Sequence, residues 1–146
     1  MSEMVEWLNG DNAKTRIINF LQEMDKEFIP SLSSRVDIPS YAAKLAELAD
    51  TIFITNNIGQ DIASCSIYCN QRDAYISSIA VKKSYQGKGI GHMLMDEVKA
   101  HIKNRCGAIV LHVHISNRNA IYYYKKNDFE EKQINADWIE MVYYMR

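Results

Sequence analysis

The spacing of apolar residues predicts two helices in the first third of the chain. Apolar side chains recur every three or four positions in two stretches, which is typical of amphipathic helices. The first stretch contains Ile17, Ile18, Leu21 and Met24, and the second contains Tyr41, Leu45 and Leu48. Asp37 is suited to cap the second helix, and Pro39 is suited to its first turn. The polar stretch 28–36 between them predicts a loop, which either connects the helices or contacts a substrate through Phe28 and Arg35.

From residue 51 onward the pattern changes to the alternation that predicts strands. The expected strands are 51–56, 62–69, 74–81, 108–115, 129–134 and 138–145, with helices at about 90–105 and 119–126 between them, and a short strand is expected within 4–8. This order predicts a single domain over 1–146. Its fold class is α/β, a sandwich in which helices flank a mixed, mostly antiparallel central sheet.

The charge of the chain is nearly balanced, with a net charge of −1 over 146 residues. Broad attraction to nucleic acid or to an anionic membrane requires a large basic excess, so neither partner is expected. The first ten residues include Glu3 and Glu6 and do not have the pattern of a signal peptide, and no stretch is apolar for long enough to span a bilayer. A cytoplasmic location is therefore expected.

The three cysteines are expected to be packing residues. Cys65 and Cys69 lie four apart in a predicted strand, roughly 13 Å from each other at about 3.3 Å per residue, which is too far for a disulfide. No Cys-x-x-Cys or Cys/His spacing is present, so no disulfide framework and no metal site are expected.

The stretch 84–95 joins a glycine-rich turn to an amphipathic helix. Gly87, Gly89 and Gly91 let the backbone bring its N–H groups close to an anion, the helix start adds unpaired N–H groups, and Lys88 adds a positive charge. The spacing of the glycines fits neither a P-loop nor a dinucleotide fingerprint. The turn therefore predicts a site for a phosphate-bearing cofactor, with a flexible loop before a core helix as the alternative.

Two segments resemble the GNAT family of N-acetyltransferases, which transfer an acetyl group from acetyl-coenzyme A to an amine. The segment 76–91 fits the family's strand, turn and helix, with its Gln-x-x-Gly-x-Gly core at Gln86, Gly89 and Gly91. The segment 117–129 is close to the family's Asn-x-x-Ala-x-x-x-Tyr-x-x-x-Gly-Phe. Two motifs in the family's order are far more specific than one, and they imply the GNAT-type α/β sandwich.

The second motif places Asn117, Ala120, Tyr124 and Phe129, and it departs from the family at Asp128, where glycine is usual. Aspartate tolerates a left-handed backbone better than most residues, so the turn that ends the helix is still expected.

The resemblance implies acetyl-coenzyme A as the donor and no metal. Its pyrophosphate would lie on the glycine turn, and its pantetheine would pair with the preceding strand like an added strand. The residues implied are Gln86, Gly87, Lys88, Gly89, Ile90, Gly91 and His92 for the pyrophosphate, Ile79, Ala80 and Val81 for the pantetheine, Asn117 where the central strands part, and Lys126 or Lys125 for a phosphate. For the lysines, a solvated helix face is the alternative.

Tyr124 is the candidate general acid. A phenol with a pKa of about 10 can protonate a leaving thiolate of comparable basicity, and Tyr124 shares a helix face with Asn117 and Ala120. The alternative is that the run 122–124 only packs.

His112 is the candidate general base. Some relatives carry glutamate in the strand where this chain has Ser77 and Ser78, so that base is absent. In the branch that acetylates ribosomal-protein N-termini, a glutamate stands five residues before the asparagine, at the position of His112. An imidazole, with an ordinary pKa of about 6.5, can accept the proton. His114 lies on the same strand face, and for both histidines packing is the alternative.

These residues predict an acetyl-coenzyme A-dependent N-acetyltransferase that works by direct attack in a ternary complex. A small molecule with a primary amine is the first choice of acceptor, and a protein or peptide N-terminus is the alternative. A non-catalytic acyl-coenzyme A-binding module is the alternative from another class. The tyrosine-rich end, 138–144, could wall the acceptor site or form a homodimer interface.

Overall fold

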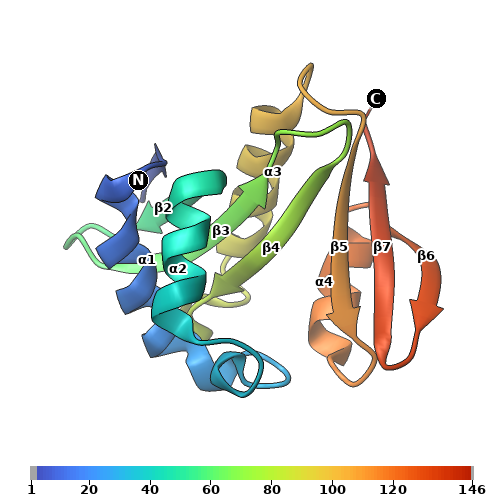
Figure 1. Ribbon diagram of the computed structural model, residues 1–146, viewed down its shortest axis with the longest axis horizontal. Helices are drawn as coiled ribbons and strands as arrows, with labels where there is room; N and C mark the ends of the chain where they lie inside the picture. The colour runs from blue at the N-terminus through green and yellow to red at the C-terminus, as the bar shows by residue number, and fades with distance from the viewer. Residues whose placement is uncertain (1–2, 146) are drawn as a thin grey trace.

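The computed structural model describes residues 3–145 and contains one seven-stranded sheet (Figure 1). Its strand order is β1-β2-β3-β4-β5-β7-β6. The strands are β1 (Met4–Leu8), β2 (Asp50–Thr55), β3 (Asp61–Tyr68), β4 (Ala74–Val81), β5 (Ala108–His114), β6 (Glu130–Asn135) and β7 (Trp138–Tyr144). Only β4 and β5 pair in parallel among the strands described, so the sheet is mixed and mostly antiparallel, as predicted.

Helices cover both faces of this sheet (Figure 1). The α-helices are α1 (Asp11–Met24), α2 (Ile38–Leu48), α3 (Ile90–Ile102) and α4 (Arg118–Lys126), and short 3-10 helices lie at η1 (Asp25–Glu27), η2 (Leu32–Ser34) and η3 (Lys83–Tyr85). One apolar core packs α1 and α2 against the sheet, and a second packs α3 and α4 against it. The α/β sandwich is thereby confirmed. None of the helices in residues 3–145 is long and apolar enough to cross a membrane.

The capping predicted for α2 is present, but its buried face lies one position away from the predicted one. Asp37 accepts a hydrogen bond from the Ser40 N–H at 3.1 Å, and Pro39 lies in the first turn. Leu48 is 49% exposed, which corrects its place in the apolar stripe. The buried stripe follows the helix period at Ala42, Leu45, Ala46 and Ala49. The small alanines let the helix lie close to α1 and the sheet.

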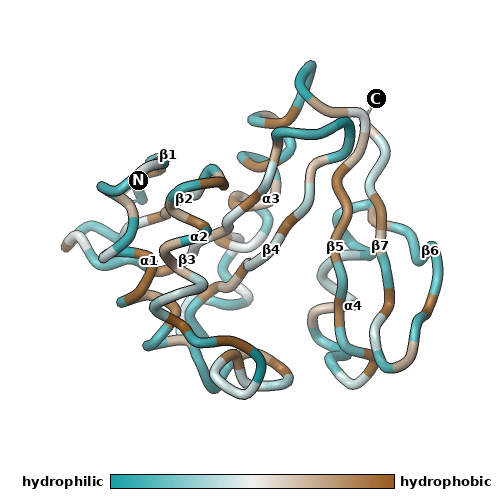
Figure 2. The backbone as a smooth tube through the Cα atoms, viewed as in Figure 1, coloured by the Kyte–Doolittle hydropathy of each residue, from teal (hydrophilic) through white to brown (hydrophobic). Residues whose placement is uncertain are grey.

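The predicted element ends differ from the structure by one to three residues. Cys69 follows β3 rather than belonging to it, and α3 ends at Ile102. The turn after α4 forms as expected, since Asp128 has φ of 72° in the left-handed region. Figure 2 shows apolar residues along β5 and β7, whereas the edge strand β6 is mostly hydrophilic and exposed throughout. Charged side chains on an edge strand discourage pairing with other chains.

The sheet opens at its middle. β4 and β5 pair only at Ala74 with Ile109 and at Tyr75 with Val110, and beyond these pairs they diverge (Figure 1). β4 also carries a bulge, because Ser66 pairs with Ser78 and Ile67 with Ile76, so that Ser77 has no register partner on β3. Both features place the second half of β4 at the border of a cavity.

Candidate active site

A cavity of about 820 Å³ lies where β4 and β5 diverge. The second half of β4 and the turn after it form one side, and β5 and the start of α4 form the other. The α1–α2 connection contributes Phe28 and Arg35, and the end of the sheet contributes Trp138, so the loop predicted from 28–36 does reach the candidate site. One cavity therefore gathers segments from both halves of the chain.

The glycine turn has the backbone that an anion site requires. Gly87 has φ of 77° and Gly89 has φ of 84°, conformations that glycine adopts without steric cost. Gly89 is the N-cap of α3, so the unpaired N–H groups of the first helical turn point toward the turn. The Gln86 side chain donates to the Val81 carbonyl at 2.9 Å and fixes the turn to the end of β4. These N–H groups and the helix dipole suit a pyrophosphate.

Gly91 is a glycine for a different reason. A Cβ on this residue would lie 3.0 Å from the Cε1 atom of Tyr123. The Tyr123 hydroxyl donates to the Gly91 carbonyl at 2.6 Å, so the ring lies directly on the first turn of α3. Burial raises the pKa of Tyr123, which keeps its hydroxyl a donor. The contact joins α3 to α4 at the border of the cavity.

One edge of β4 is open toward the cavity. Ile79, Ala80 and Val81 pair with β3 on one side, at Cys65, Ser64 and Ala63 respectively. Within residues 3–145, no strand pairs with the other edge of 76–81. Ile79, Ala80 and Val81 line the cavity. An open edge at a cavity can pair with an extended ligand through its backbone N–H and C=O groups.

Tyr124 presents a phenol to the cavity. The residue is 7% exposed and packs against the rings of Tyr123 and Phe129, with centroids 5.3 and 5.8 Å away. Its hydroxyl makes no hydrogen bond to the other residues of the described chain. Because no fully enclosed polar side-chain atom among the described residues is without a partner, this hydroxyl oxygen is not fully enclosed. Burial, with smaller contributions from Cys65 and Tyr75, raises the pKa of Tyr124. The phenol therefore stays protonated at neutral pH and is free to donate.

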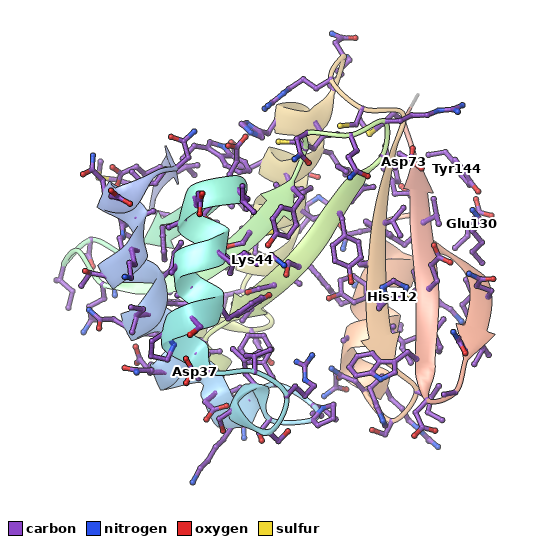
Figure 3. All side chains as sticks on the ribbon, in the orientation of Figure 1. Asp37, Lys44, Asp73, His112, Glu130 and Tyr144 are labelled. Atoms are coloured by element: carbon purple, nitrogen blue, oxygen red, sulfur yellow. The ribbon has the colours of Figure 1, made fainter. Side chains whose placement is uncertain are left out.

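His112 forms a pair with Tyr75 across the parting strands. The Tyr75 hydroxyl lies 2.8 Å from His112 Nδ1, and His112 itself is exposed toward the cavity (Figure 3). Burial raises the pKa of Tyr75, an effect that the nearby charge of Arg35 opposes. Tyr75 was not identified from the sequence, because the parallel register that brings it beside His112 cannot be read from either strand alone.

His114, Trp138 and Arg35 line the cavity and contact one another in turn. The His114 and Trp138 rings meet edge to face with centroids 5.3 Å apart, and Arg35 lies over the Trp138 ring at 5.3 Å. His114 Nδ1 accepts a hydrogen bond from the Ser116 N–H at 3.2 Å, which orients its ring. The Arg35 contact links the α1–α2 connection to β7.

The candidate residues from the sequence divide into three groups. Those that line the cavity are Ile79, Ala80, Val81, Gln86, Gly87, Gly91, His112, Asn117 and Tyr124. Asn117 also caps α4, accepting from the Ala120 N–H at 3.3 Å. Gly89, the exposed N-cap of α3, and Ile90, the buried first residue of this helix, are not among the lining residues.

Three candidate side chains lie away from the cavity. Lys88 lies over the Tyr85 ring at 5.7 Å, and Lys126 lies over the Tyr122 ring at 5.4 Å. The His92 side chain is 73% exposed and pairs with Asp96 on the next turn of α3. These contacts do not point at the cavity, so any role of these three residues in cofactor binding stays a prediction, and for His92 it concerns the backbone N–H.

This fold, with a central sheet parted beside a glycine turn, is shared with solved acetyltransferase structures. The chain belongs to the acetyltransferase (GNAT) family, whose model matches residues 15–129, and the family predicted from the two motifs is thereby confirmed. It is an acyltransferase by family.

Its sequence is 39% identical over 75 residues to N-alpha-acetyltransferase 60 of Danio rerio, a match that covers 49% of this chain and 31% of that protein. The match thus spans about a third of that relative's length. The ribosomal-protein-S18-alanine N-acetyltransferase from Escherichia coli has a TM-score of 0.75 at 19% identity, covering 97% of this chain and 94% of that one. The PaiA N-acetyltransferase from Thermoplasma acidophilum, solved in complex with coenzyme A, has a TM-score of 0.78 at 16% identity and covers 99% of both chains. At these identities the two structures show the fold alone.

Proposed function

We propose that this protein transfers the acetyl group of acetyl-coenzyme A to the α-amine of a protein or peptide N-terminus. The observation that carries the proposal is the meeting, in one cavity, of an imidazole–phenol pair, a second and unpartnered phenol, an open strand edge and a glycine turn. The choice of acceptor rests on the relative from Danio rerio, whose name gives it an N-alpha-acetyltransferase activity. It also rests on the long α1–α2 connection, which borders the cavity and offers a wall for an extended peptide.

The donor fits the residues present. The N–H groups of 86–91 would hold its pyrophosphate, and the open edge of Ile79, Ala80 and Val81 would hold its extended pantetheine. A bound acetyl-coenzyme A supplies a thioester whose carbonyl carbon accepts the amine. A backbone N–H on the β4 edge would donate to the carbonyl oxygen as it gains negative charge.

His112 prepares the acceptor. A peptide ammonium must lose a proton before its nitrogen can attack. When Nδ1–H donates to the Tyr75 hydroxyl, the imidazole is held in the tautomer whose Nε2 lone pair is available as a base. Tyr75 is thus the positioning residue for His112.

Tyr124 completes the transfer. The amine nitrogen bonds to the carbonyl carbon, the carbon–sulfur bond breaks, and the Tyr124 hydroxyl donates its proton to the leaving thiolate. His112 then releases to solvent the proton it accepted from the ammonium, and Tyr124 regains one. The products are an acetylated amine and free coenzyme A.

A small-molecule amine is the second candidate acceptor. Arg35 and Trp138 both line the cavity and contact each other, and such a contact would leave less room for a long peptide than for a compact acceptor. This was the first choice from the sequence, and it stays a prediction beside the peptide.

Release of free thiol from acetyl-coenzyme A, followed over a panel of acceptors, tests these alternatives. The panel pairs peptides that have a free N-terminus with the same peptides blocked at the N-terminus and carrying an internal lysine, and it includes small primary amines. Turnover restricted to free N-termini supports the proposal. Turnover only on small amines supports the second candidate. Binding of acetyl-coenzyme A with no turnover on any amine of the panel identifies a non-catalytic module.

A further inference from the structure

A cluster of three different metal-ligating side chains lies at the end of α3 remote from the glycine turn. Asp50 begins β2, Cys69 follows β3, and His101 lies in the last turn of α3. None of the three lines the catalytic cavity. Antiparallel pairing of Asp50 with Ile67 brings the start of β2 beside the end of β3, and α3 packs over β3. The fold therefore assembles residues that are far apart in the sequence.

The three ligand atoms converge on one point. Asp50 Oδ2 lies 2.8 Å from His101 Nε2 and 3.1 Å from Cys69 Sγ, and all three ligand atoms lie within 4.8 Å of one another. The side chains of His101 and Asp50 are 21% and 19% exposed, so the cluster is partly buried.

Neighbouring groups hold two of these ligands in place. The Trp7 ring stacks on the His101 imidazole with centroids 3.7 Å apart. Asn9 Nδ2 donates to the other carboxylate oxygen, Asp50 Oδ1, at 3.4 Å. Such contacts orient a ligand before a metal arrives, which is the role that outer residues have in metal sites.

A cationic group already lies against the cluster. Arg105 Nη1 is 2.8 Å from His101 Nε2 and 3.3 Å from Asp50 Oδ2. His101 Nε2 thus lies within hydrogen-bond distance of both an anion, Asp50, and a cation, Arg105, and its tautomer decides which of the two contacts is a hydrogen bond. In the tautomer that carries its proton on Nδ1, the Nε2 lone pair accepts from Arg105, and the same lone pair would bind a metal ion.

We propose that Asp50, Cys69 and His101 form a zinc site, with Arg105 occupying the position of the cation when no metal is bound. Thiolate, imidazole and carboxylate together suit zinc, whereas magnesium and calcium select oxygen ligands. As the zinc–sulfur bond forms, the Cys69 thiol releases its proton to solvent, Arg105 moves out, and water takes the fourth position. No group is oxidised or reduced.

The site would act on the fold rather than on the reaction. It joins β2, the β3 end and α3, and the ion would lie near the C-terminal end of α3, where the helix dipole favours a cation. The absence of a Cys-x-x-Cys spacing predicted no metal site, and the proposal departs from that prediction because its ligands come from three separate elements.

Titration of the full chain with cobalt(II), as a spectroscopic substitute for zinc, tests the site. We expect one equivalent to give a thiolate-to-cobalt charge-transfer absorption, which zinc then removes by displacement. Cys69→Ser should abolish this absorption and weaken zinc binding at least tenfold. Cys106→Ser is the matched control, since the Cys106 thiol contacts the backbone carbonyls of Cys69 and Gln71 and none of the three ligand atoms. His92→Gln removes the exposed His92–Asp96 pair as a competing site. Both controls should bind like the unmodified chain.

Arg105→Gln separates a metal site from a hydrogen-bonded cluster. Removal of the competing positive charge should tighten zinc binding about tenfold or more, since the charge lies within a few ångströms of the proposed ion. Without metal, the midpoint of thermal unfolding of Arg105→Gln should be equal to or lower than that of the unmodified chain. Added zinc should raise this midpoint more in Arg105→Gln than in the unmodified chain. The proposal is overturned if cobalt gives no thiolate absorption, if Cys69→Ser keeps it, or if Arg105→Gln leaves zinc affinity unchanged.

Discussion

Replacement of Tyr124 with phenylalanine removes the hydroxyl proposed to protonate the leaving thiolate and little else. The ring contacts with Tyr123 and Phe129 stay, because phenylalanine keeps the ring. The lost hydroxyl has no hydrogen-bond partner among residues 3–145, so the free energy of unfolding should change by less than about 1 kcal/mol. Loss of a general acid typically lowers the rate by about 10²-fold or more, which is about 2.7 kcal/mol of transition-state stabilisation.

The assay measures kcat and the KM for acetyl-coenzyme A by thiol release, together with thermal unfolding. We expect Tyr124→Phe to lower kcat about 100-fold, with little change in cofactor affinity or stability. Tyr123→Phe is the matched control one position away. It loses the 2.6 Å hydrogen bond to the Gly91 carbonyl and should cost about 1 kcal/mol of stability while keeping most of kcat. A Tyr124→Phe rate within twofold of the unmodified rate would remove Tyr124 as the acid.

Four further outcomes are expected. His112→Ala should lower kcat about 10²-fold, and the loss should be larger at low pH than at high pH. Tyr75→Phe should keep part of kcat and shift the acidic limb of the pH–rate profile. Identical profiles for Tyr75→Phe and the unmodified enzyme would remove the positioning role of Tyr75. Gly91→Ala should raise the Kd for coenzyme A about tenfold, measured by calorimetry, because its Cβ meets Tyr123 at 3.0 Å, and an unchanged Kd would contradict this. Burial raises the pKa of Tyr41 to about 12, whereas the phenol of the unfolded chain has a pKa of about 10. The unfolded chain therefore loses this proton first, and the free energy of unfolding falls as pH rises from about 10 to 12. Tyr41→Phe should flatten that decline in denaturant titrations, and an equally steep decline in this variant would exclude Tyr41 as its cause.

The parts of this fold that depend on short stretches of sequence could be predicted. The Asp37 cap, the alternation in 74–81 and the positive-φ glycines at 87 and 89 each result from neighbours along the chain, and the structure contains all three. Leu48 shows the limit of such local reasoning, because which face of α2 is buried is decided by the helices and strands packed against it.

The parts that depend on register between distant strands could not be predicted. The Tyr75–His112 pair requires the parallel pairing of β4 with β5, and the contact of Arg35 with Trp138 joins segments about a hundred positions apart. The same holds for Asp50 beside His101. The direction of a long charged side chain could not be predicted either, since the position of Lys88 near a motif does not fix that its amine lies over the Tyr85 ring.

The short pairing of β4 with β5 sets the size of the cavity from a distance. Ala74 and Ile109 are fully buried at the end where the two strands still pair, and the strands diverge from there toward the cavity. A bulkier side chain at this hinge would change the angle between the strands, and so the width available at the far end. Residues that never contact an acceptor can therefore govern which acceptors enter, and selection for a new substrate can act on the core as well as on the surface of the site.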